Sequence, residues 1–226
     1  MIIAEDVLLL AYDDESGAAD PWAANLDYRL AGALLVELAQ LGRIELSHAD
    51  DPSGARAGRV VVRDAASAGH PELDAALETI AEKPRKPADL VEPPSRGLTN
   101  RLLDGLAARG VLRVETGRVL GIIPVTRWPA EDSTHETALR SRLRDVLLER
   151  ATPDARDAAL LAVLRGSGLE RGLVPKERRT EAADRLEQLA QSGWATEAAS
   201  TAIDEMTAVI VAAVIVPSIV TTTIAR

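Results

Sequence analysis

The sequence predicts a mainly α protein with a few short strands, and three observations lead to this fold class. Apolar residues recur at helical spacing through most of the 226 residues. The alternating pattern of a β-strand is confined to two short runs and one hairpin. No long linker divides the chain, so we expect one domain over residues 1–226, with about seven or eight helices.

The N-terminal part of the chain is predicted to form two helices joined by a loop. Residues 4–12 begin a short helix, and the loop that follows contains Trp22. In the second helix, residues 25–41, a helical stripe with i, i+4, i+8 spacing marks the face toward the core and consists of Leu30, Leu34, Leu38 and Leu41.

Two strands and a proline-rich stretch come next. Residues 43–46 and 59–64 are predicted strands on either side of a turn-rich segment. Pro71 begins a helix at residues 71–83, because its missing N–H is not needed in a first turn. Residues 83–94 contain four prolines and are predicted to be a punctuated connector, which cannot form one continuous helix.

Residues 96–125 combine a helix with a hairpin. The helix ends at Gly110, and the extended residues 111–125 are expected to reverse direction at Thr116 and Gly117. Further amphipathic helices are predicted at residues 133–151, 153–168 and 176–193.

Two further predictions concern the C-terminal half of the chain. The helix that starts near residue 133 carries Ser133 three residues before Glu136, which is the pattern of a capping box. The apolar run at residues 208–220 has 13 residues, whereas a membrane span needs about 20. We therefore expect this run to form a buried helix.

A similar phrase ends three of the predicted helices: "LAQLGRIEL", "LAARGVLRV" and "LAQSGWATE". In each, a glycine (Gly42, Gly110 or Gly193) follows the last apolar turn. Glycine readily takes the left-handed conformation that closes a helix end. The repetition therefore predicts helix caps, not a functional motif.

The sequence offers no recognisable catalytic centre. It contains no cysteine, which excludes disulfides and thiolate chemistry. His48, His70 and His135 are not spaced as metal ligands on one helix. There is no Walker-type phosphate loop and no nucleophile-elbow serine. We expect no catalytic residues, no bound metal and no cofactor.

The charge distribution and one aromatic residue indicate instead a binding function. The formal net charge is −9, yet residues 83–127 hold nine basic and four acidic residues. Such a segment can attract a polyanion locally, or can simply form a solvated face. Trp22 lies in a loop without apolar periodicity, where it can anchor at a membrane interface or cover the edge of the core. Since no signal peptide opens the chain, we expect a cytoplasmic protein at the inner face of a membrane.

The segment from "EDVLLL" through Trp22 to "GALLVELAQLGRI" resembles the Golgi phosphoprotein 3 family, and "LLDGLAARGVL" and "LRSRLRDVLLER" follow in that family's order. The resemblance implies a helical bundle ringed by amphipathic helices, with a protruding β-hairpin. It also implies a non-enzymatic peripheral membrane protein that binds phosphatidylinositol 4-phosphate and retains protein clients. The arginine-rich, lysine-poor composition suggests a bacterial-type relative.

The resemblance further implies a lipid site formed by a tryptophan and three arginines. Trp22 and Arg96 match two of these positions, whereas Ala31 and Thr99 occupy the other two. Arg101 is the nearest further cation, so we expect Trp22, Arg96 and Arg101 to contact an anionic headgroup. Two missing charge-assisted bonds would cost about 3–6 kcal/mol, so no particular lipid is predicted.

The hairpin suggests a second contact surface. Its second arm carries Leu120, Ile122 and Ile123, and an exposed apolar ribbon needs a partner surface. Hairpin contacts between protomers are also what the resemblance implies. We expect weak self-association, or contact with a membrane, through these side chains.

One alternative belongs to a different functional class. A helix followed by a hairpin in residues 97–125 is also the end of a winged-helix DNA-binding module. The basic side chains available for phosphate contacts would be Arg96, Arg101, Arg109, Arg113 and Arg118. However, the helix offers few polar residues for base edges, and the acidic remainder of the chain would repel DNA.

Overall fold

The computed structural model describes residues 1–21, 26–119, 122–191 and 201–214, which form nine α-helices and two small antiparallel sheets. The helices are α1 (Ile3–Leu10), α2 (Leu26–Gln40), α3 (Pro71–Ala81), α4 (Pro87–Ser95), α5 (Leu98–Ala108), α6 (Thr134–Leu147), α7 (Ala155–Leu164), α8 (Arg179–Gln191) and α9 (Thr201–Val214). The strands are β1 (Ile44–Leu46), β2 (Val60–Val62), β3 (Glu115–Val119) and β4 (Ile123–Arg127), and two short 3-10 helices are η1 (Leu169–Gly172) and η2 (Lys176–Arg178). The predicted mainly α class is confirmed.

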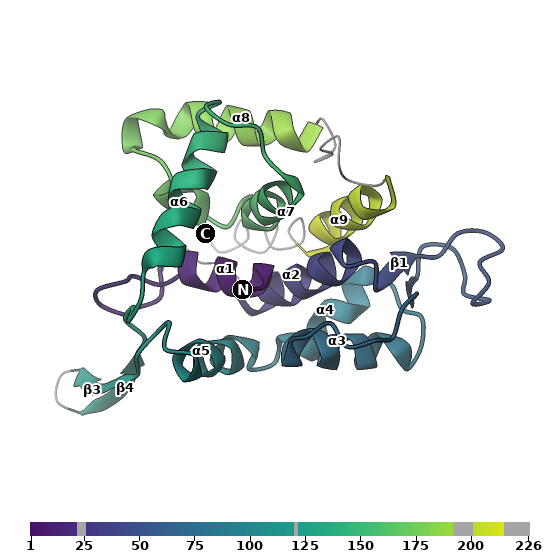
Figure 1. Cartoon of the computed structure of the whole chain (residues 1–226), viewed down its shortest axis with the longest axis horizontal. Coiled ribbons are helices and arrows are strands. Elements are labelled where there is room, and N and C mark those ends of the chain that lie inside the picture. The colour runs from purple at the N-terminus through teal and green to yellow at the C-terminus, as the bar shows by residue number, and fades with distance from the viewer. Residues whose placement is uncertain (22–25, 120–121, 192–200, 215–226) are drawn as a thin grey trace, which may run out of the picture.

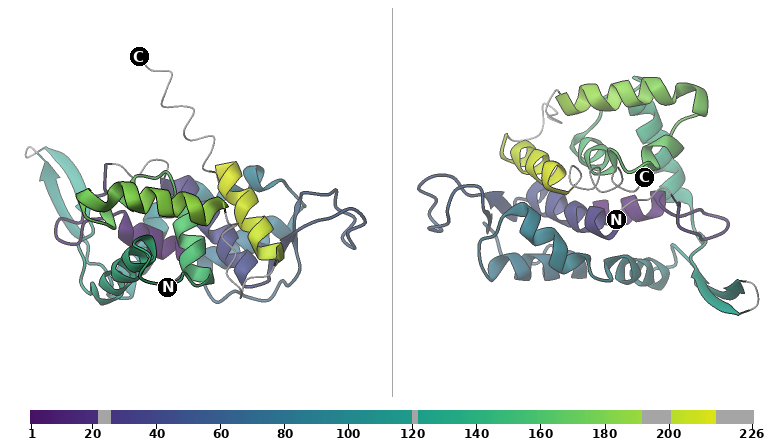
Figure 2. Two further views of the ribbon diagram at one scale, coloured as in Figure 1. Left: turned by 90° about the horizontal axis from the view of Figure 1, so that it is seen from above. Right: turned by 180° about the vertical axis from the view of Figure 1, so that it is seen from behind.

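The helices are arranged in layers around the N-terminal pair α1 and α2 (Figure 1). In this view α3, α4 and α5 lie below the pair, and α6, α7, α8 and α9 lie above it. The view from behind shows the same arrangement (Figure 2, right), and α2 contacts helices of both outer layers. The β3–β4 hairpin and the loop between β1 and β2 project from opposite ends of the molecule.

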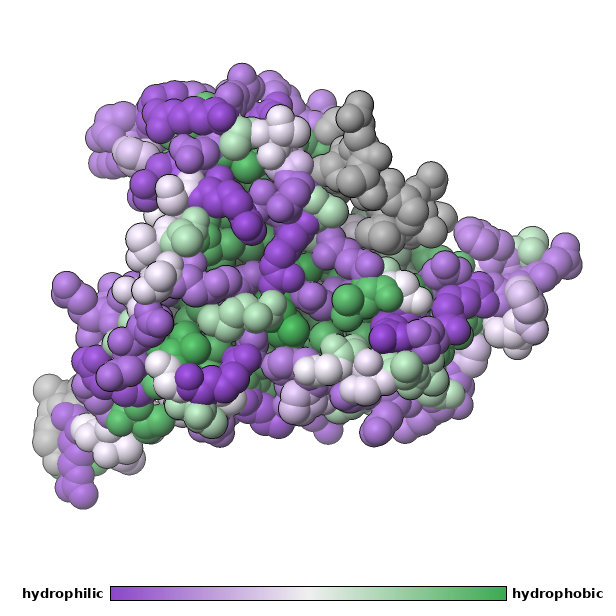
Figure 3. All heavy atoms as spheres, in the orientation of Figure 1, coloured by the Kyte–Doolittle hydropathy of each residue, from purple (hydrophilic) through white to green (hydrophobic). Residues whose placement is uncertain are grey.

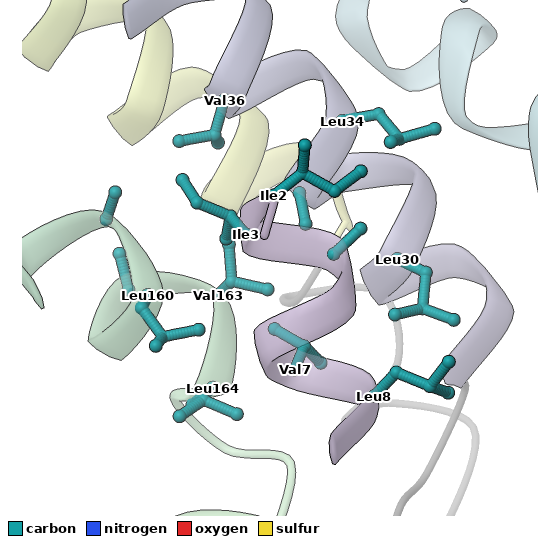
Figure 4. Close-up of a cluster of buried hydrophobic side chains, with 14 of the residues drawn as sticks. Ile2, Ile3, Val7, Leu8, Leu30, Leu34, Val36, Leu160, Val163 and Leu164 are labelled. Atoms are coloured by element: carbon teal, nitrogen blue, oxygen red, sulfur yellow. The ribbon is translucent and has the colours of Figure 1, made fainter. Parts of the chain in front are cut away.

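The core is built on α1, whose eight residues are all buried. Figure 4 shows Ile3 and Val7 of α1 between side chains of α2 and α7, among them Leu30 and Leu160. Of the leucines predicted to face the core, Leu30, Leu34 and Leu38 of α2 are fully buried, and each such side chain contributes about 1.5–3 kcal/mol. The prediction is wrong for Leu41, which is 48% exposed because α2 ends before it, at Gln40. Hydrophilic side chains cover the outermost helix α8 at the top of Figure 3, as expected for an amphipathic outer layer.

Two of the three predicted glycine caps lie in the described residues, and both are confirmed. Gly42 and Gly110 have φ angles of +67° and +72°. After each glycine the next N–H returns to the helix: Arg43 donates to the Leu38 carbonyl and Val111 to that of Leu106, at 2.9 and 3.0 Å. Gly193 lies outside the described residues.

The proline-rich connector contains more regular structure than expected. Residues 83–86 are not helical, but α4 starts at Pro87 and continues to Ser95. Pro87 occupies the first turn, where a proline fits without loss of a hydrogen bond. Leu90 and Val91 of α4 are buried in the core. This packing stabilises a helix that the prolines alone disfavour.

The two strands predicted near residues 44–46 and 60–62 are confirmed, and they pair with each other in antiparallel fashion. The expected turn of the hairpin after α5 is wrong. Thr116 and Gly117 lie within β3, where they pair with Thr126 and Val125 of β4. The chain therefore reverses between Val119 and Ile123. The residues before β3 are already engaged elsewhere: Val111 closes the cap of α5, and Leu112 forms a bridge with Ala130.

The capping box predicted for α6 is also wrong. Ser133 makes no capping hydrogen bond, and the Thr134 N–H instead donates to Asp132 at 2.9 Å. Glu136, the expected partner of Ser133, is buried.

Near the C-terminus, Ile210 and Val211 of α9 are buried, as the apolar run predicted, while residues 215–220 of that run lie outside the described part. None of the helices in the described part is long and apolar enough to cross a bilayer.

Candidate functional site

The segment that contains Trp22 is tied to the segment that contains Arg96. Trp22 itself lies outside the described residues, but Asp27 follows it by five positions in the first turn of α2. The Asp27 carboxylate accepts hydrogen bonds from the Thr99 hydroxyl at 2.5 Å and from the Thr99 N–H at 3.1 Å. Thr99 stands three residues after Arg96, so these hydrogen bonds join the start of α2 to the start of α5, close in sequence to Arg96.

Arg96 lies in the short connection between α4 and α5. It follows the last residue of α4, and Gly97, with φ of +67°, turns the chain into α5. The Arg96 side chain is exposed, and its guanidinium has no hydrogen-bond or ion-pair partner in the part of the chain that the structure describes. Arg96 therefore presents its charge to solvent.

Arg101 is engaged within the protein. Its guanidinium forms a two-pronged ion pair with Glu72 of α3, in which Nε and Nη2 lie 2.9–3.0 Å from the carboxylate oxygens. Its remaining nitrogen, Nη1, donates to the Arg96 carbonyl at 2.7 Å. Arg101 thus fixes the backbone that carries Arg96, and most of its own charge is neutralised by Glu72.

The position of Ala31 offers no space for a cation, because Ala31 is fully buried on the core side of α2. Arg29, two residues earlier, does not replace the missing arginine. It is buried and donates to the Val163 and Arg165 carbonyls at 2.8 and 3.1 Å, at the end of α7. Burial lowers the pKa of Arg29. Its role is to close the end of a helix.

The loop before Trp22 is held against α6 and the end of the hairpin. Gly17 accepts a hydrogen bond from the Trp128 N–H at 3.0 Å, and Asp14 accepts one from the Ala130 N–H at 2.9 Å. Burial, followed by a hydrogen bond with Asp14, raises the pKa of Glu136 to about 8, although Arg140 opposes this shift. The contact between Glu136 and Asp14 therefore joins this loop to α6.

A buried charge network on α1 was not foreseen from the sequence. Glu5 lies 3.0 Å from His70 Nε2, and Asp6 lies 2.7 Å from both His135 Nε2 and Arg156 Nη2. Burial alone would raise the pKa of Glu5, but hydrogen bonds from His70, the Ile2 N–H and Arg109 lower it to about 2. The sequence signal was the acidic pair inside an apolar helix, which only buried partners could make stable.

These histidines do not form a metal site. They bind different carboxylates, and within the described residues no group of three potential ligands is close enough to hold a metal ion. The network is therefore structural: it fixes α1 between the elements that supply its partners.

The hairpin places apolar side chains in solvent near its reversal. Ile122 is 75% exposed and Ile123 is 53% exposed. Leu120 lies outside the described residues. The described part of the chain thus leaves an apolar contact surface available at the end of this ribbon.

The arginines proposed for DNA contact are mostly paired with carboxylates. Arg101 pairs with Glu72, Arg109 with Glu5, and Arg113 with Glu115. An arginine held in this way must give up its partner before it can bind a phosphate. These pairs favour the membrane hypothesis over the winged-helix alternative.

Comparisons with known proteins agree with this architecture. The family model of Golgi phosphoprotein 3 matches residues 3–206. The chain is also similar to a protein of Eremothecium gossypii named vacuolar protein sorting-associated protein 74. The two are 28% identical over 170 residues, which cover 66% of this chain and 50% of that protein. The matched region therefore spans about half of the relative's length.

Proposed function

Since the chain belongs to the Golgi phosphoprotein 3 family, we propose that it is a non-enzymatic adaptor that binds peripherally to anionic membranes. The headgroup-binding surface consists of the loop with Trp22 and the α4–α5 turn with Arg96, and Arg101 holds this turn in place. Protein clients would be recruited to the membrane by the bound adaptor. We place this activity at the inner, cytoplasmic face of a membrane.

The observation that carries the proposal is the pair of hydrogen bonds between Asp27 and Thr99. They join the start of α2, which follows Trp22 in the sequence, to the start of α5, which follows the exposed Arg96. An indole at the interface together with a cation at a phosphate is a common way to hold a protein on an anionic bilayer.

Tyr28 adds to this surface. It lies in the first turn of α2, next to Asp27, and is 45% exposed. Tyrosine, like tryptophan, is suited to the headgroup region because one end of the side chain is apolar and the other polar. The sequence does not indicate a membrane contact for Tyr28, because a single aromatic residue in an amphipathic helix is usually part of the core.

The number of available cations limits the selectivity of the site. Ala31 is buried, Thr99 is bonded to Asp27, and Arg101 is paired with Glu72. Arg96 therefore supplies most of the attraction in the described part of the surface. We expect binding that depends on the total anionic charge of the membrane, with little preference for one headgroup.

Vesicle flotation tests this function. We expect the protein to float with vesicles of phosphatidylcholine that contain about a third phosphatidylserine. Added salt should release it, because salt screens the attraction. Arg96→Gln should weaken binding about fivefold, because one basic residue near such a surface contributes about 1 kcal/mol. Arg150→Gln is the matched control, since Arg150 is exposed at the far end of α6. Equal binding to neutral and anionic vesicles, or equal loss in both variants, would contradict the proposal.

The hairpin provides a second test, which concerns self-association. We expect a concentration-dependent increase in sedimentation coefficient that Ile122→Asp abolishes, because a charge at this exposed apolar position cannot be buried between protomers. The change should not affect folding, since Ile122 is 75% exposed. Thr126→Asp, on the same hairpin but away from its end, should leave association intact. A wild-type protein that remains monomeric at high concentration would rule out this interface.

A further inference from the structure

A cavity of about 510 Å³ lies between α8 and the segment that joins α7 to α8. These elements are in the layer on the other side of α1 and α2 from α5 (Figure 1). We call this cavity the α7–α8 pocket and define it by Arg165, Arg171, Arg179, Leu147, Val174 and Leu186. None of its lining residues belongs to the headgroup surface around Arg96. Its volume is in the range of small-molecule sites.

The floor of the pocket is apolar. Leu147 from the end of α6, Val174 after η1 and Leu186 of α8 line it, and each is less than 8% exposed. The backbone turns sharply at Gly166 and Gly168, with φ of +69° and +92°, so that the loop after α7 forms a wall beside α8. A floor of this kind favours an aliphatic or ring portion of a ligand.

The rim of the pocket carries positive charge that the protein does not use. Arg171 has no side-chain partner among the described residues, and Arg179 donates only Nε, to the Arg171 carbonyl at 3.1 Å. Both side chains are in exposed positions. Their free N–H groups can form charge-assisted hydrogen bonds with an anion.

The two carboxylates of the pocket are already committed. Glu170 accepts hydrogen bonds from Ser167 Oγ at 3.1 Å and from the Gly168 N–H at 2.8 Å. Glu187 is paired with Arg165. Glu170 keeps its charge, because its two donors are neutral, but three arginines against two carboxylates leave the lining with a net positive charge.

We propose that the α7–α8 pocket binds a small amphiphilic anion, with its phosphate or carboxylate group on Arg171 and Arg179 and its apolar part on the floor formed by Leu147, Val174 and Leu186. The ligand is a soluble molecule or the end of a lipid, which share this chemistry. Binding here is independent of the membrane contact made through Arg96.

Titration calorimetry of the full chain with octyl phosphate tests the proposal. We expect saturable binding that is at least about tenfold tighter than binding of inorganic phosphate, which lacks the tail, or of octyl glucoside, which lacks the charge. Equal affinity for all three probes, or the absence of saturation by octyl phosphate, would overturn the proposal.

Variants locate the site. Combined Arg171→Gln and Arg179→Gln should weaken octyl phosphate binding by at least about tenfold. Ala183→Leu should also weaken it, because Ala183 lines the pocket from an exposed position and a larger side chain would fill the space without disturbing the core. Arg178→Gln is the control, since Arg178 pairs with Glu181 outside the pocket. Unchanged affinity in the double variant would overturn the assignment.

Vesicle flotation then separates the pocket from the headgroup surface. The double variant should float with anionic vesicles as the wild-type protein does, while Arg96→Gln should retain octyl phosphate binding. The contrary result has two parts: the double variant loses as much vesicle binding as Arg96→Gln, and octyl phosphate does not bind the wild-type protein. Arg171 and Arg179 would then be part of the membrane contact, and the pocket proposal would fail.

Discussion

Replacement of Gly17 by alanine is expected to lower the free energy of unfolding by about 2–5 kcal/mol. Gly17 has a φ of +60°, a conformation that costs other residues about 1–2 kcal/mol. An added Cβ would also collide with the backbone nitrogens of Trp128 and Pro129. Because those atoms belong to the main chain, the loop or the segment after β4 would have to move. Urea denaturation, followed by circular dichroism, measures the loss.

Gly58→Ala is the matched control for this experiment. Gly58 has a similar φ of +74°, but no atom lies within 4 Å of the position that its Cβ would occupy. We expect the free energy of unfolding of this variant to decrease by only about 1–2 kcal/mol, the cost of the left-handed conformation. Equal losses of stability in the two variants would show that the collision with Trp128 and Pro129 does not add to the effect of Gly17→Ala.

Replacement of Glu136 by glutamine is expected to remove a pH dependence of stability. The folded-state pKa of Glu136, about 8, is above its ordinary value of 4.5, because burial and Asp14 disfavour the charged form. Between these two values the folded protein holds a proton that the unfolded chain has released. Stability should therefore decrease by about 1 kcal/mol per pH unit as the pH rises from 5 to about 8.

Glutamine can donate to Asp14 and accept from Arg140, as the protonated carboxyl does, but it does not titrate. We expect the urea midpoint of Glu136→Gln to exceed that of the wild-type protein increasingly toward pH 8. Glu181→Gln, at an exposed position on α8, should parallel the wild-type profile. If the Glu136→Gln and wild-type profiles were parallel, the ion pair with Arg140 would keep Glu136 charged throughout this range.

The helices could be predicted from the sequence because their signals are local. The spacing of Leu30, Leu34 and Leu38 defined the buried face of α2, and all three side chains are fully buried. Gly42 and Gly110 marked helix ends for reasons contained within a few residues. The fold class follows from such patterns with no knowledge of which helices meet.

The errors arose where a distant segment decides the local structure. Thr116 and Gly117 resemble a turn, but the pairing of Leu112 with Ala130 moves the start of the hairpin along the chain. Glu136 has the spacing of a capping residue, yet Asp14, more than a hundred residues away, changes its role. No local pattern could indicate either contact.

The candidate site was predicted in part for the same reason. Arg96 is exposed as a binding residue must be, but nothing near Arg101 in the sequence indicates its ion pair with Glu72. The contact between Asp27 and Thr99 joins two helices and likewise has no local signal. The resemblance suggested which residues to consider, and the structure shows that Arg96 is exposed whereas Arg101 is paired with Glu72.

The charge network of α1 has a consequence for the order of folding. Glu5 and Asp6 are translated before His70, Arg109, His135 and Arg156, whose side chains stabilise the two carboxylates. Before residue 156 is available, burial of α1 would leave at least one carboxylate without its cation, at a cost of several kcal/mol. Helix α1 is thus expected to enter the core only after α7 has been synthesised. Its two acidic side chains delay collapse until the helices on both sides of it exist.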